Sequence, residues 1–302
     1  MANLAGAPAA EPAHTTRGGP GDTGGRLLAE GARAVLANVP AAACLGLLVV
    51  AWQVTVTTLG ISDFILPAPL EILKVTVRFF PQLMKHTWTT TSEILLGFAI
   101  GNVVAVIMAV FIVNSRFVER ALYPLIIASQ TIPKVAVAPL FLIWFGSGLT
   151  PKVVITAIVC FFPTVVNTVQ GLRATDEHAI DLLRLVAASR RQIFVKLQFP
   201  SALPYFFAGL KISIALAVIG AIIGEWVGAN SGLGYLIMYS TQTLRTDLMF
   251  AALLVVSVLG IVLYLVAVLF ERIGDLSEQK PDALDDLRHA LQGQQQKTDR
   301  DQ

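Results

Sequence analysis

The chain has 302 residues, of which 55% are hydrophobic and only 14% are charged. A soluble domain carries about 25% charged residues, and here the deficit falls in long apolar runs. This composition argues against a large soluble core and indicates a membrane protein. Cys44 and Cys160 both lie inside apolar runs, so we expect neither a disulfide nor a thiol-ligated metal site.

The order of polar and apolar segments predicts the domain organisation. Residues 1–34 are rich in Ala, Gly, Pro and Thr, which predicts a disordered cytoplasmic tail. Residues 35–275 predict a transmembrane domain, and the charged, Gln-rich residues 276–302 predict a cytoplasmic C-terminal tail. Within this domain, six apolar segments are each long enough to cross about 30 Å of hydrocarbon as a helix. The six expected spans are residues 39–59, 89–113, 121–145, 153–169, 203–227 and 248–270.

The basic residues favour an orientation in the cell (inner) membrane with both termini in the cytoplasm. The residues that would lie inside are Arg116, Arg120, Arg173, Arg184, Arg190, Arg191, Lys196, Arg272 and Lys280. The outside would carry Lys74, Arg78, Lys85, Lys152 and Arg245, so the first outer loop weakens the bias. This orientation places the loop of residues 173–200 in the cytoplasm.

That loop predicts two short amphipathic helices. In the first, Ala179, Leu182, Leu183 and Val186 follow helical spacing on one face. Ser189, with Gln192 three residues later, has the form of a capping box and predicts the start of the second helix. Its apolar face would be Ile193, Phe194 and Leu197, and Pro200 and Pro204 would bound it. Short helices are marginal alone, so this apolar surface must dock on something.

Specific residues of this region resemble the EAA loop of ABC importer permeases. They are Glu177-His178-Ala179, Ala188-Ser189, Phe194, Pro200, Pro204 and Ala208-Gly209-Leu210, with Ala187 at the turn between the two helices. Residues 66–272, including Pro67-Ala68-Pro69, the run 132–140 and Trp144-Phe145-Gly146, are similar to the nitrate, sulfonate, taurine, pyrimidine-precursor and riboflavin branch of these binding-protein-dependent permeases.

The resemblance implies an all-α polytopic fold of the type I ABC importer permease (MetI-like) class. It also implies that the second loop helix docks in a groove of a separate ABC ATPase subunit, which would use ATP and magnesium, and transmits the closure of that subunit to the spans. An extracytoplasmic solute-binding protein and a second permease copy, forming a homodimer, are the other implied partners, beside membrane lipid. The cargo would be a small polar solute such as nitrate, a sulfonate, taurine, a pyrimidine precursor or riboflavin.

Two positions depart from the family pattern. His178 replaces the middle Ala of the Glu-Ala-Ala triplet, and we expect it to be exposed and solvated. Ala187 replaces the Gly of the turn. A left-handed backbone at Ala187 would cost about 1 kcal/mol, so we predict a turn that Ala adopts without strain.

The residues also weigh against other functions. The sequence has no G-x-x-x-x-G-K-[ST] phosphate loop, so no cofactor is expected in this chain and nucleotide hydrolysis would belong to another polypeptide. An intramembrane enzyme is disfavoured because the four His residues fall in tails or loops. No nucleic-acid partner is expected. An ion-coupled secondary transporter is the nearer alternative, but it leaves the paired loop helices unexplained.

Charged residues inside apolar runs mark candidate translocation residues, because they are costly in a bilayer. Lys134 follows Pro133 well inside the third span. There it lines the path, pairs with a backbone carbonyl or snorkels along a distorted helix. Glu225 could gate or contact solute, whereas interfacial solvation is expected for Glu93. Close helix packing within one subunit is expected at Gly97 and Gly101. A position on the central path between subunits is expected at Gly220 and Gly224.

Overall fold

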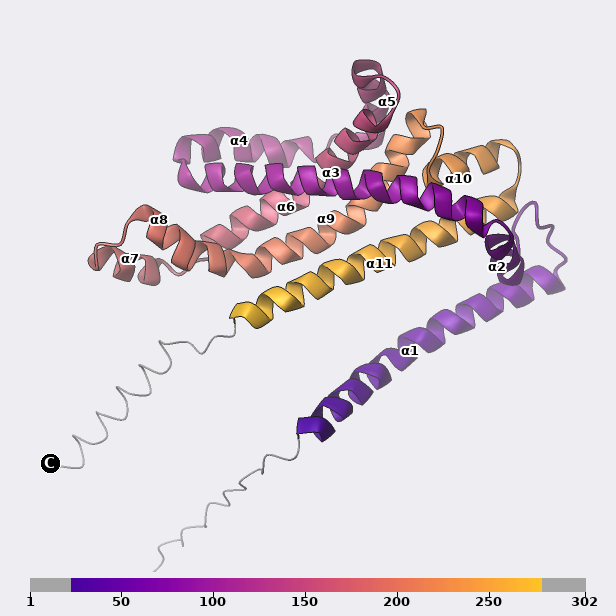
Figure 1. The fold of residues 1–302 in the computed structure, drawn as a ribbon, viewed down its shortest axis with the longest axis horizontal. Helices are drawn as coiled ribbons and strands as arrows, with labels where there is room; N and C mark the ends of the chain where they lie inside the picture. Colours follow the sequence, from indigo (N-terminus) through magenta and orange to yellow (C-terminus); the bar gives the residue numbers. More distant parts are fainter. Residues whose placement is uncertain (1–22, 279–302) are drawn as a thin grey trace, which may run out of the picture. The chain divides into compact units, whose positions relative to one another are not determined.

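The computed structural model describes residues 23–278, and this part of the chain is built of helices without strands. The all-α expectation is therefore confirmed. The helices in chain order are α1 (Thr23–Thr58), α2 (Pro69–Arg78), α3 (Phe80–Asn114), α4 (Arg116–Ser129), α5 (Lys134–Phe145), α6 (Leu149–Arg173), α7 (Glu177–Leu185), α8 (Arg190–Ile193), the π-helical turn η1 (Phe194–Gln198), α9 (Phe199–Gly228), α10 (Leu233–Gln242) and α11 (Thr246–Glu278) (Figure 1).

α1 forms a unit of its own with the residues up to Gly60. It begins at Thr23, within the segment 1–34 for which the sequence predicts a tail, and its apolar part is the shorter stretch Ala42–Thr58. The remainder of both predicted tails, residues 1–22 and 279–302, lies outside the described residues.

Four helical stretches of the described chain are long and apolar enough to cross a membrane. They are Phe80–Asn114, Leu149–Arg173, Arg190–Gly228 and Thr246–Arg272, and the pair α4 and α5 adds a fifth if it forms one broken span. Most of these helices extend beyond the predicted spans, because hydropathy marks the lipid-crossing core rather than the ends of the helix. The predicted count of six fits this arrangement with the apolar part of α1 but remains a prediction.

α6 packs between α3 and α9 along much of its length (Figure 1). Glycines permit this close approach: a Cβ on Gly101 would lie 2.5 Å from the carbonyl oxygen of Ala157, and Gly97 faces Thr156. Tight packing of Gly97 and Gly101 within one subunit is thus confirmed. The expectation for Gly220 and Gly224 is wrong.

Gly220 and Gly224 of α9 also face α6. A Cβ on Gly220 would lie 3.0 Å from Cα of Thr156, and one on Gly224 would lie 3.0 Å from Cα of Lys152. Because α6 belongs to the same chain, both glycines fit α9 against its neighbour rather than against a second subunit.

The third predicted span is broken. α4 ends at Ser129, α5 begins at Lys134, and the two axes are bent by 103°. Pro133 is the N-cap of α5, and its ring both fixes its own backbone and restricts the preceding residue. Pro124 and Pro139 lie inside the two helices, so Pro133 is the proline at the break.

Candidate functional site

The loop between α6 and α9 forms the two predicted helical segments. Asp176 begins the first, since its carboxylate accepts a hydrogen bond of 2.9 Å from the backbone N–H of His178. His178 itself is exposed, as the sequence predicts. Ser189 and Gln192 form the predicted capping box, with N–H to oxygen distances of 2.8 and 3.3 Å.

The turn at Ala187 differs from the expectation. The N–H of Ala188 donates to the carbonyl of Leu183 at 2.9 Å, and the N–H of Ala187 donates to the carbonyl of Arg184 at 3.0 Å. These two bonds define a Schellman motif, whose C′ residue takes a left-handed backbone. Ala187 has φ of 58°. The prediction of an unstrained turn is therefore wrong, because a Cβ in this conformation crowds the following carbonyl.

The second loop helix continues directly into a membrane-crossing helix. Residues Arg190–Gly228 form one helical stretch, in which the π-helical turn Phe194–Gln198 joins α8 to α9. Pro200 and Pro204 do not bound the loop helix as expected; both lie inside α9, with Pro200 in its first turn, where a missing N–H is tolerated. α8 is thus continuous with α9, without an intervening loop.

The apolar residues of the loop divide between two surfaces. Leu182, Leu185 and Val186 of the α7 end are 59%, 83% and 70% exposed. Phe194 instead is half-buried and lines an apolar cavity of about 370 Å³ within the protein. The other residues around that cavity are Val106, Val110, Thr168, Leu172, Phe199, Ala202, Leu203 and Phe206. The exposed apolar ridge at the end of α7 is therefore Leu182, Leu185 and Val186, which we call the α7 ridge.

The remaining residues of the EAA resemblance lie in different surroundings. Glu177, Ala187, Ser189 and Pro204 are exposed, whereas Ala179, Ala188 and Pro200 are half-buried. Gly209 is buried at the contact between α9 and α6, where a Cβ would lie 2.9 Å from Cβ of Asn167 and 3.1 Å from the carbonyl oxygen of Pro163. Its role in this structure is helix packing.

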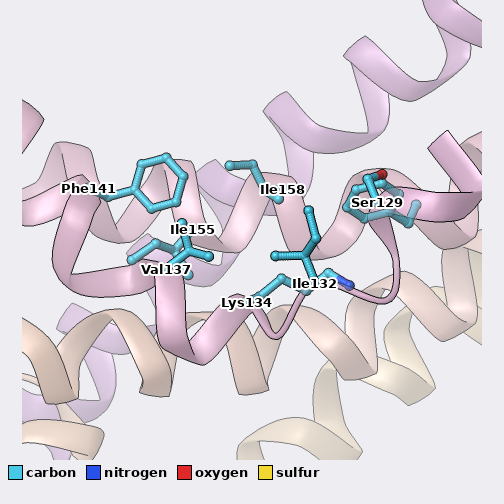
Figure 2. Close-up of a pocket in the computed structure, with 8 residues that line it drawn as sticks. Ser129, Ile132, Lys134, Val137, Phe141, Ile155 and Ile158 are labelled. Atoms are coloured by element: carbon cyan, nitrogen blue, oxygen red, sulfur yellow. The ribbon is translucent and has the colours of Figure 1, made fainter. Parts of the chain in front are cut away.

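Lys134 lies at the break between α4 and α5, beside a cavity of about 180 Å³. Figure 2 shows Lys134 at the start of α5, with Ile155 and Ile158 of α6 lining the same space. Its ammonium group donates to the carbonyl of Gln130 at 3.1 Å and lies 4.9 Å from the centre of the Phe162 ring. Lys134 therefore binds a backbone carbonyl and also lies beside a cavity. The break in the helix makes such carbonyl oxygens available.

Glu225 and Glu93 belong to a buried polar cluster that the sequence does not reveal. Lys152 of α6 donates to Glu93 at 2.6 Å, and Glu93 is fully buried. The expectation of interfacial solvation for Glu93 is therefore wrong. Glu225, 2% exposed, accepts a hydrogen bond of 2.6 Å from Thr90 and one from the backbone N–H of Gly234 at the start of α10. A hollow of about 290 Å³ lies beside Glu225.

One local signal could have revealed part of this cluster. Thr90 and Glu93 are three residues apart and therefore share a face of α3. The sequence predicts Lys152 in an outer loop because it stands just before an apolar run. This prediction is wrong, since α6 begins at Leu149 and Lys152 is buried.

Comparisons with known proteins agree with these features. Residues 101–273 match the family model described as binding-protein-dependent transport system inner membrane component. The formylaminopyrimidine transport permease protein ThiX of Halalkalibacterium halodurans is 39% identical over 216 residues, covering 71% of this chain and 86% of the relative. The riboflavin transport system permease protein RibX of Chloroflexus aurantiacus is 39% identical over 232 residues, covering 75% and 85%.

A solved structure supports the fold. The inward-facing MetNI methionine ABC transporter aligns with a TM-score of 0.58 at 19% identity, covering 65% of this chain and 98% of the solved chain. The long apolar helices show that the chain is a multi-pass membrane protein, with a helical loop outside the apolar core. Within that class, the chain belongs to the binding-protein-dependent transport system inner membrane components. It is a permease of the ABC importer type, not a catalytic subunit.

Proposed function

We propose that this permease admits a small solute to the cytoplasm by alternating access, driven by an ABC ATPase that docks on its α7–α8 loop. The observation that carries the proposal is the α7 ridge: three large apolar side chains are exposed on a loop whose second helix is continuous with a membrane-crossing helix. Isolated surface apolar residues are common, but a ridge rimmed by charged residues is typical of a protein interface.

The basic residues at this loop support a cytoplasmic location. Arg184, Arg190, Arg191 and Lys196 are all exposed, and positive residues concentrate on the cytoplasmic side of membrane proteins. In this orientation both termini are cytoplasmic, and the α10 end of the molecule faces a solute-binding protein on the outer side. ATP and magnesium are bound by the ATPase.

Within the loop, each candidate residue has a distinct role in coupling. Glu177 and Ala179 lie in the first turn of α7, and Ala187, Ala188 and Ser189 set the angle between the two helices. Phe194, Pro200, Pro204 and Gly209 then fix the helical stretch Arg190–Gly228 on the membrane body. The ATPase therefore contacts the end of α7 rather than the second loop helix alone, because Phe194 of the second helix faces a cavity. The later residues carry the movement of the ATPase into α9.

We place the translocation path along the broken helix and between two copies of the chain. Lys134 and Pro133 lie at the break, and Glu225 borders the hollow beside α10. Interrupted helices in membrane proteins are tolerated where their backbone groups line a cavity. The spans of one chain are too few to enclose a path, so the working unit is a homodimer.

The cargo is a vitamin precursor of the pyrimidine or flavin class. The support is the 39% identity to permeases whose names give formylaminopyrimidine and riboflavin as solutes. A thermal-shift screen of the cognate solute-binding protein tests the assignment. The panel is formylaminopyrimidine, riboflavin, taurine, an alkanesulfonate and nitrate.

A ligand at 100 times its Kd adds about 2.7 kcal/mol to the stability of the binding protein. We therefore expect formylaminopyrimidine or riboflavin to raise its melting temperature clearly. A shift with taurine, the sulfonate or nitrate alone would contradict the assignment of the cargo and leave the importer mechanism intact.

A further inference from the structure

Four helices meet at the buried cluster around Glu93. Thr90 and Glu93 come from α3, Lys152 from α6 and Glu225 from α9, and the N-terminus of α10 completes it. The side chains of Glu93 and Lys152 are 1% and 8% exposed, and their closest atoms are 2.6 Å apart. Together with Glu225, which is 2% exposed, three ionisable groups are thus removed from water.

Glu225 has a full set of hydrogen-bond donors. Thr90 donates to its Oε1 at 2.6 Å, and the N–H groups of Gly234 and Tyr235 donate to its Oε2 at 2.5 and 3.2 Å. These N–H groups belong to the first turn of α10, whose positive end favours an anion. Gly232 and Gly234 pass so close that a Cβ on Gly232 would collide with the carboxylate. The surroundings of Glu225 are therefore built for an ionised carboxylate.

Within the described part of the chain, only one of the two carboxyl oxygens of Glu93 has a hydrogen-bond donor. Its Oε1 accepts from Lys152, but its Oε2 is buried, and no hydrogen-bond donor among the described residues reaches that atom. The carboxyl groups of Glu93 and Glu225 are neighbours in this cluster. Thr90, one helical turn before Glu93, donates to Glu225, and Gly224, next to Glu225, packs against Lys152, the partner of Glu93. Two ionised carboxylates in this position would repel each other and leave one buried oxygen without a donor, which is strongly unfavourable.

The net charge of the cluster also indicates that the two glutamates are not ionised together. Glu93 and Glu225 carry two negative charges when both are ionised, and Lys152 carries one positive charge. His86 of α3 accepts a hydrogen bond at Nδ1 from the N–H of Gly232, and it adds no charge in this tautomer. α10 contributes no Asp, Glu, Lys or Arg side chain. One more positive charge would make the cluster neutral.

We propose that Glu93 and Glu225 bind one proton between them, so that the junction of α3, α6, α9 and α10 is electrically neutral. The proton sits on Oε2 of Glu93 and is donated to the carboxylate of Glu225. Each oxygen of the pair then has a donor or acts as one, and Lys152 balances the remaining negative charge. The contact between α3 and α9 becomes attractive, and α10 is held on the ionised Glu225.

Infrared spectroscopy of the full chain in liposomes at pH 7 tests the proposal. A protonated carboxylic acid has a C=O stretch separate from that of a carboxylate, and 13C-glutamate labelling assigns it to Glu. We expect this band in the parent protein and its loss in both Glu93→Gln and Glu225→Gln. The matched control is Glu271→Gln, because Glu271 pairs with Lys211 alone at 2.8 Å and should leave the band unchanged. A parent protein without the band, or a band that survives in both variants, would overturn the proposal.

The melting temperature of the purified chain gives an independent test. Each single Gln variant keeps the cluster neutral without a bound proton, so its melting temperature should stay within about 2 °C of the parent value. The double variant leaves Lys152 buried and unpaired, and its melting temperature should fall by roughly 10 °C. Adding Lys152→Met to the double variant removes the charge and should restore most of that loss. Single variants that are as unstable as the double variant would contradict charge balance.

Discussion

At the scale of single residues, the turn at Ala187 shows how one side chain departs from what its backbone favours. Its φ of 58° and the two bonds of the Schellman motif require the conformation that Gly adopts most easily. Leu244, which ends α10 in the same way, also has φ of 58°. Both positions therefore carry strain that a Gly would remove.

We expect Ala187→Gly to stabilise the protein. Removing the strain of a left-handed Ala should raise the free energy of unfolding by about 1 kcal/mol. The greater conformational freedom of Gly in the unfolded chain offsets part of this gain. The net result should be a rise of about 1–3 °C in the melting temperature of the purified chain. Transport should stay nearly intact, because the turn already has the geometry of Gly.

Two matched variants make this prediction specific. Leu244→Gly should raise the melting temperature similarly, since it removes the same strain outside the loop. Ala188→Gly should give no rise, because Ala188 is not among the positive-φ residues. A stabilisation by Ala188→Gly equal to that of Ala187→Gly would show that strain at residue 187 is not the cause.

Most elements of the coupling loop follow from local sequence. Ser189 and Gln192 predict the cap of the second helix because the capping box lies within four consecutive residues. The surface that Phe194 packs against cannot be predicted from local sequence. Helical spacing identifies an apolar face of a helix but not the element that covers it. Here α3, α6 and α9 provide that partner for Phe194, and the α7 ridge is left exposed.

This division predicts different effects for two Asp substitutions. Leu185→Asp changes an 83% exposed side chain, so the melting temperature should stay near the parent value while ATPase binding weakens about tenfold or more. Phe194→Asp buries a charge in an apolar cavity, so the melting temperature itself should fall. Copurification with the ATPase and thermal unfolding measure the two effects. Normal ATPase binding by Leu185→Asp would remove the α7 ridge from the interface.

At the scale of the whole molecule, hydropathy predicts the all-α class and the membrane-crossing helices because lipid demands long apolar runs. The break before Lys134 is only partly predictable: Pro133 indicates a distortion, but its angle depends on packing against α6. The sequence does not reveal the buried cluster, because Glu93, Lys152 and Glu225 are far apart in the sequence and meet only when α3, α6 and α9 pack.

Uptake into proteoliposomes tests the central claim most directly. The permease is reconstituted with and without its ATPase, and the solute is supplied with the binding protein on the outside. We expect uptake only when ATP and magnesium reach the ATPase, and none by the permease alone under a proton or sodium gradient. Uptake by this chain alone, driven by an ion gradient, would contradict the account.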